Sequence, residues 1–253
     1  MTELRVVAYP DPRAELARLR TKDLNFHPEE EGPFVPGNGW RIDRYSRALP
    51  GETPGEPEPR GAWETARDLS EAYEFVDPTL VRAFYDPREP LLGRTILLEV
   101  HFWGLRIYAG VRVAGVDDAI REVGGRKARV CVWNYRTLED HFEAGQIDYE
   151  VWKWLDSGEV EFRIDAFSRP ARIDQPVVRL GFKLFGRSTQ VRFARRACDR
   201  MAALTEAAQR DPGGVQPAPS VAPDLAIRPE PGKETAFDRF FRRLKDTVPF
   251  ARR

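Results

Sequence analysis

QIDYEVWKWLDSGEVEFRIDAF, residues 146–167, contains two extended stretches on either side of a turn. Val160, Phe162 and Ile164 alternate with charged residues, so they share one face of a strand. The Asp-Ser-Gly sequence at 156–158 is typical of a hairpin turn between two strands. The stretch therefore predicts an antiparallel strand pair with one apolar face.

Strand patterns continue upstream of this hairpin. Residues 105–113 and 127–135 place apolar side chains at every second position, and residues 94–103 are rich in Ile, Leu, Val and Phe. The links between these stretches are short, which favours antiparallel neighbours over a parallel sheet. A further strand is expected at 40–48.

Helical patterns flank the strands. Apolar residues recur at helical spacing over 176–209. Short helices are predicted at 63–73 and 78–85, the second because Asp77 and Pro78 suit the start of a helix. Strands followed by one long helix indicate an α+β fold with an antiparallel sheet of about five to seven strands.

Composition divides the chain into four parts. Residues 1–61 are predicted to form an N-terminal arm with one strand, because residues 32–61 hold six Gly and six Pro. Residues 62–209 are predicted to form the core domain, and residues 210–234 a flexible Pro-rich linker. Residues 235–253 have the pattern of a basic amphipathic helix, which suits docking on the chain's own domain, on a protein partner or on a membrane surface.

The charge and cysteine content exclude several classes of function. Lys and Arg total 40, as do Asp and Glu, so the net charge of zero gives no argument for a nucleic-acid partner. Cys131 and Cys198 offer neither a disulfide framework nor metal-ligand spacing, and no motif implies a cofactor.

No apolar run approaches the ~18 residues of a spanning helix, and residues 1–20 lack a signal-peptide core. A cytoplasmic protein is therefore expected.

The segment 137–145, TLEDHFEAG, is the strongest candidate for chemistry. His141 lies near carboxylates in a loop between two strands, and a histidine in such a place can act as an acid or base near neutral pH. The alternative is structural, because Thr137 and Asp140 also fit the capping box of a single helical turn. A metal site is not supported, since no second metal-spaced pair accompanies the histidine.

A second candidate segment ends the last predicted strand. Arg169 could hold an anion at the mouth of a cavity, or it could simply pair with an acid where Pro170 ends the strand. Ser168 lacks the glycine-flanked turn of a nucleophilic serine, so nucleophilic catalysis is poorly supported.

The residues of both segments together resemble a known family. The pattern consists of Tyr135, Thr137-Leu138, His141, Glu143, Gly145 and the sequence AFSRPA at 166–171. It is similar to the domain of unknown function 1990 family, also called uncharacterised protein family 0548, of bacteria and plants. Glu139 and Asp140 stand where that family usually has Pro-Gly, and Gln146 stands where it usually has Glu.

The resemblance implies a layout rather than an activity. It implies a meander of strands closed by a C-terminal helix, similar to the helix-grip or START-like proteins, in which the sheet wraps a long helix and leaves an apolar cavity. His141 and Glu143 are the candidate catalytic groups of such a cavity. Its expected ligand contacts are Tyr135, Thr137, Ser168 and Arg169.

Three functions remain open at this point. The leading expectation is a module that binds or carries a small apolar or amphipathic ligand between sheet and helix. The second is an enzyme of the cyclase, hydrolase or isomerase type that uses His141 as acid and base, oriented by Glu143. The third is an interaction module that presents residues 235–253 to a partner or membrane.

Overall fold

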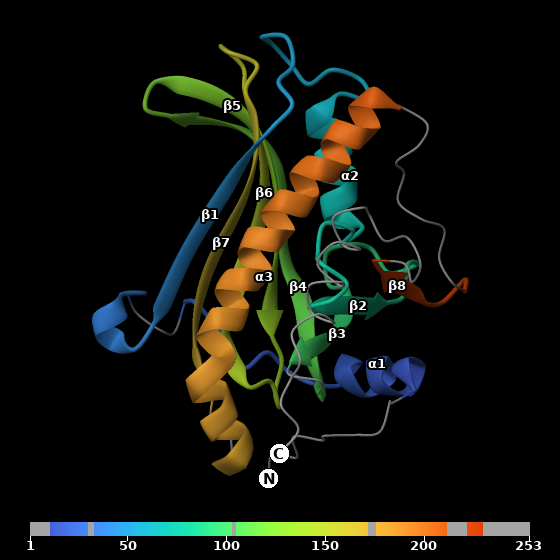
Figure 1. Cartoon of the computed structure of the whole chain (residues 1–253), viewed down its shortest axis with the longest axis vertical. Coiled ribbons are helices and arrows are strands. Elements are labelled where there is room, and N and C mark those ends of the chain that lie inside the picture. Colours follow the sequence, from blue (N-terminus) through green and yellow to red (C-terminus); the bar gives the residue numbers. More distant parts are fainter. Residues whose placement is uncertain (1–10, 30–32, 103–104, 172–175, 212–221, 230–253) are drawn as a thin grey trace, which may run out of the picture.

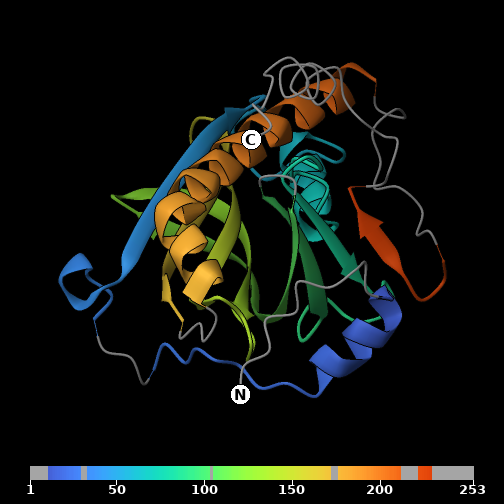
Figure 2. The same cartoon turned by 60° about the horizontal axis from the view of Figure 1, so that its bottom comes forward.

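The computed structural model describes residues 11–29, 33–102, 105–171, 176–211 and 222–229. Within these residues a single antiparallel sheet curves around one long helix, α3 (Pro176–Arg210) (Figure 1). Figure 2 shows the curved sheet on one side of α3, so the helix lies against the concave face of the sheet. The expected α+β helix-grip fold is therefore confirmed.

The described residues form eight strands, more than the five to seven expected from the sequence. In sheet order they are β1 (Arg41–Leu49), β7 (Val160–Pro170), β6 (Glu143–Trp154), β5 (Arg126–Thr137), β4 (Leu105–Val123), β3 (Thr95–Phe102), β2 (Val81–Tyr85) and β8 (Ala226–Arg228). Every neighbouring pair is antiparallel, as the short links predict. The first strand of the chain thus lies beside the last strand of the meander, at the edge opposite β8.

The main hydrophobic core lies between the concave face and the helices. Alternation in β6 turns Tyr149 and Val151 into this core, and it turns Trp152 to the opposite face. From α3, Cys198 and Met201 reach the core at the helical spacing that the sequence shows. α3 contacts β1 and β7 and packs beside α2 (Ala62–Glu71).

The N-terminal segment contributes more than the one strand expected. It also forms α1 (Pro12–Arg20) and a single 3-10 turn at Pro36–Asn38. Asp11 begins α1 because its carboxylate accepts a hydrogen bond from the backbone N–H of Arg13 at 3.1 Å. Leu16 and Leu19 are buried with side chains of β2 and β3, so α1 covers the convex face of the sheet (Figure 2).

The prediction of a helix at 78–85 is wrong, because Val81–Tyr85 form strand β2 of the sheet. The Asp77 carboxylate accepts hydrogen bonds from the backbone N–H and hydroxyl of Thr79 at 2.8 and 2.6 Å, and from Arg196 at 2.6 Å. These contacts make a local turn instead of a helix start. Val81–Tyr85 then lies almost wholly buried between β3 and β8.

Part of the segment predicted as a linker is also a strand. Residues 222–229 lie within 210–234, and β8 pairs with β2 from Ala83↔Arg228 to Tyr85↔Ala226. Burial explains the difference, because Ala226 is fully buried and Arg228 forms an ion pair with the buried Glu74 at 3.2 Å. Tertiary contacts therefore override the low strand propensity of the composition.

The expected tail helix at 235–253 lies outside the described residues. Among the helices that are described, none is both long and apolar enough to cross a membrane.

Candidate functional site

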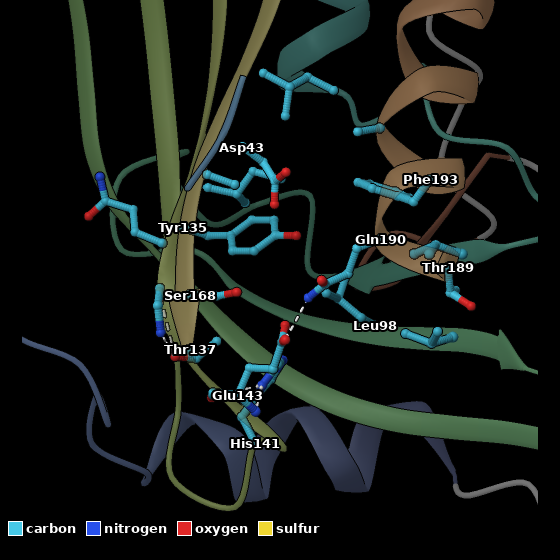
Figure 3. A pocket seen from close by; sticks show the side chains of 18 of the residues that line it. Asp43, Leu98, Tyr135, Thr137, His141, Glu143, Ser168, Thr189, Gln190 and Phe193 are labelled. Atoms are coloured by element: carbon cyan, nitrogen blue, oxygen red, sulfur yellow. Dashed lines mark hydrogen bonds between the residues drawn. The ribbon is translucent and has the colours of Figure 1, made fainter. Parts of the chain in front are cut away.

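A cavity of about 180 Å³ lies between the concave face of the sheet and α3. Most of its wall is apolar, and Thr137, Glu143 and Ser168 add polar groups where β5 ends, β6 begins and β7 approaches its end. Apolar side chains come from Val81, Leu98, Val100, Ile107, Phe142, Ile147, Ile164, Ala166, Phe193 and Ala194. Figure 3 shows Tyr135, Glu143 and Gln190 pointing into the same space from β5, β6 and α3.

Strand alternation places these side chains. In β7, Ile164, Ala166 and Ser168 line the cavity, because every second residue of a strand faces the same side. Arg169 therefore faces the opposite side, where its guanidinium carbon lies 4.9 Å from the ring centre of Trp40. The structure brings Ser168 to the cavity, and Arg169 is not among the lining residues.

The segment 138–142 forms a tight turn between β5 and β6, and the alternative of a capped helical turn is wrong. Asp140 has a positive φ of 67°, which a tight turn accommodates and a right-handed α-helix does not allow. The Thr137 hydroxyl binds across the strands instead of capping a helix. It accepts from the backbone N–H of Gly145 at 3.0 Å and donates to the side chain of Asn25.

His141 is fixed to the backbone of this turn. Its side chain is buried, and Nδ1 lies 2.9 Å from the backbone nitrogen and 3.0 Å from the backbone oxygen of Glu143. Desolvation lowers the pKa of His141 to about 4, against the opposing effect of that backbone contact. The ring is therefore neutral at pH 7, and its Nδ1 contacts the backbone of Glu143, not the carboxylate that was expected to orient it.

Glu143 is the group of this site that titrates near neutral pH. Burial raises its pKa to about 7, while the nearby Arg41 and the hydrogen bond from Gln190 act in the opposite direction. Nε2 of Gln190 donates to Oε1 of Glu143 at 2.5 Å, and Nη1 of Arg41 lies 3.7 Å from the same oxygen. An acid or base role near pH 7 thus fits Glu143 better than His141.

Tyr135 belongs to a cluster of three buried phenols. Its hydroxyl accepts from Tyr149 at 3.2 Å and lies 3.5 Å from the hydroxyl of Tyr73, which is 3.4 Å from that of Tyr149. Burial raises the pKa of all three, so they stay protonated, and Tyr73 and Tyr135 are the two that line the cavity. Tyr73 has a φ of 61°, an uncommon conformation for a bulky residue.

Gln190 and Asp43 are among the polar residues that line the cavity and that sequence reasoning did not select. Gln190 lies one helical turn before Ala194, on the stripe of α3 that faces the sheet, and a polar residue on that stripe was the available signal. Asp43 comes from β1 and is paired with Arg187 of α3 at 2.6 Å. Its position had no sequence signal, because β1 reaches the site only through its pairing with β7.

Residues 25–200 match the family described as Domain of unknown function (DUF1990). The chain belongs to this family. The match covers both candidate segments and most of the sheet and α3 of this DUF1990 protein. No protein of curated function matches its sequence.

Solved structures similar to this DUF1990 chain share little sequence with it. The Zhui aromatase/cyclase from Streptomyces sp. R1128 has a TM-score of 0.43 and 13% identity, covering 70% of this chain and 99% of its own. A START superfamily protein from Mycobacterium smegmatis has a TM-score of 0.37 and 12% identity, with coverages of 66% and 97%. A ginseng major latex-like protein from Panax ginseng has a TM-score of 0.39 and 8% identity, with coverages of 65% and 97%.

Proposed function

We propose that this protein binds a small, mostly apolar molecule in the cavity between the sheet and α3. The observation that carries the proposal is the make-up of the cavity, in which apolar walls surround a few convergent polar groups at one end. Glu143 and Gln190 supply the polar end, and the hydroxyl of Tyr135 faces the same space (Figure 3).

The volume limits the size of the ligand. At about 180 Å³ the cavity is smaller than the roughly 300–1,000 Å³ of sites for drug-sized molecules. It is close to the ~150 Å³ of an apolar protein cavity that binds benzene. The space therefore suits a molecule with one ring and a short chain, or the end of a longer amphipathic molecule.

A cavity-filling variant tests the proposal. Ala166 lines the cavity, whereas Ile42 in the adjacent strand β1 is 40% exposed. We expect propylbenzene, followed by ligand-observed NMR, to bind the wild type and Ile42→Phe alike. In Ala166→Phe the new ring occupies the site, and binding should fall at least about tenfold. Equal binding by Ala166→Phe, with its fold retained by circular dichroism, would place the ligand elsewhere.

A further inference from the structure

We propose that the ligand carries a protonated amine, and that this amine binds between the Glu143 carboxylate and the side-chain oxygen of Gln190. This inference rests on the proposed function, because it names the chemical class of the molecule in the same cavity. It is carried by unmet hydrogen-bonding capacity at the polar end of that cavity.

Gln190 provides the first argument. Its amide nitrogen donates to Glu143, which leaves its oxygen, Oε1, buried without a hydrogen-bond partner among the described residues. A buried acceptor without a donor is destabilising, and such groups are rare in folded proteins. Because Gln190 lines the cavity, a ligand placed there can supply the missing donor.

The charge of the lining provides the second argument. The charged residues among the lining side chains are Asp43 and Glu143, and neither Lys nor Arg is among the described residues that line the cavity. Asp43 already accepts hydrogen bonds from both terminal nitrogens, Nη1 and Nη2, of Arg187. Glu143 is therefore the carboxylate with capacity for a cation, since Arg41 approaches one of its oxygens only at 3.7 Å.

An ammonium group fits this pair of acceptors better than a hydroxyl. It has three donors and a positive charge, so it can bind the carboxylate of Glu143 and the amide oxygen of Gln190 together. A hydroxyl has a single donor and can satisfy one acceptor at a time. The apolar part of the ligand would then extend along Phe193 and Ile164.

The groups around Glu143 determine how binding should depend on pH. Arg41 and Asp43 face it from β1, and Gln190 and Arg187 face it from α3. Tyr135 of β5 and the neutral ring of His141 are also close, and neither carries charge near pH 7. Glu143 is therefore the group that changes charge in this range.

An ammonium needs the ionised carboxylate, so its affinity should rise with pH. With a pKa of about 7, the ionised share of Glu143 rises from about a tenth at pH 6 to about nine-tenths at pH 8. We expect a roughly tenfold gain in the affinity of an amine over these two pH units. An uncharged molecule of the same shape should not gain.

Three single-ring probes separate the possibilities by isothermal titration calorimetry. Phenethylamine, phenethyl alcohol and propylbenzene have the same shape and differ in the terminal group. On the wild type at pH 8 we expect the amine to bind at least about tenfold more tightly than the alcohol. In Glu143→Gln, which keeps the shape and removes the charge, this preference and its pH dependence should be lost. Ile42→Phe should behave as the wild type.

The outcomes distinguish the two proposals. If propylbenzene and the alcohol bind as tightly as the amine at pH 8, the cavity binds apolar ligands and the amine assignment is wrong. If the amine preference persists in Glu143→Gln, the cation is held elsewhere and the assignment also fails. If none of the probes binds, the proposed function fails together with the inference.

Discussion

Glu143→Gln should stabilise the protein at alkaline pH, although it alters a residue of the candidate site. The Glu143 carboxyl has a pKa of about 7 in the folded chain, and its ordinary value is 4.5. Because the folded pKa is the higher one, the folded state holds this proton more tightly than the unfolded state. The contribution of Glu143 to the free energy of unfolding is therefore largest below pH 4.5 and falls as the pH rises toward 7.

The size of the effect follows from the two pKa values. At about 1.4 kcal/mol per pH unit, the difference between 4.5 and about 7 corresponds to about 3 kcal/mol once both states are ionised. Between pH 5 and pH 8 the wild type should lose about 2–3 kcal/mol of unfolding free energy relative to Glu143→Gln. The glutamine cannot ionise, so the variant lacks this loss.

Urea unfolding of both proteins at pH 5, 6, 7 and 8, followed by circular dichroism, measures the difference. Every other titrating group, including His141, is common to the two proteins and cancels in the comparison. A difference in free energy that stays constant with pH would refute the reasoning. It would mean that Glu143 is ionised and well compensated, by Arg41 and Gln190, throughout this range.

Three further predictions concern other buried groups. The wild type should lose unfolding free energy as the pH falls below about 6.5, because His141 has a pKa of about 4 in the folded state and the unfolded state therefore takes up the proton first. His141→Asn should lack this loss, and urea unfolding at pH 4–7 tests the difference. Lys153→Met should cost about 3–5 kcal/mol, since it leaves the buried Glu52, 2.6 Å from Nζ, without its cation; an unchanged melting temperature would contradict this. Gly145→Ala should destabilise by at least about 2 kcal/mol, because its Cβ would lie 2.3 Å from a backbone oxygen of β7. Gly110→Ala, whose nearest neighbour is a side-chain methyl that can move, should cost less in the same thermal melts.

Part of the candidate site could be predicted from the sequence. The alternation of β7 placed Ser168 on the cavity side, and the resemblance pointed to Tyr135, Thr137 and the turn that holds His141 and Glu143. The relative roles of the last two could not be predicted. They depend on desolvation and on which atoms each side chain meets, and these follow from packing.

The remaining site residues come from elements that are distant in sequence. Gln190 and Asp43 reach the cavity only because α3 crosses the concave face and β1 pairs with β7. The polar position of Gln190 on the inner stripe of α3 is visible in the sequence, but the residue that it meets is not, since sequence periodicity defines the face of an element and not its neighbour. The same limit explains β2, whose turn at Asp77 resembles a helix start until its partners are known.

The sequence by itself determined the strand alternation, the long C-terminal helix, the antiparallel order of the meander and the family. These are local properties, because side-chain period and link length are written in consecutive residues. Only the tertiary structure decided that β1 and β8 extend the sheet at its two edges, that the cavity measures about 180 Å³, and that Glu143 rather than His141 titrates near neutral pH. Pairing at the edges, cavity volume and desolvation each arise from contacts between residues far apart in the chain.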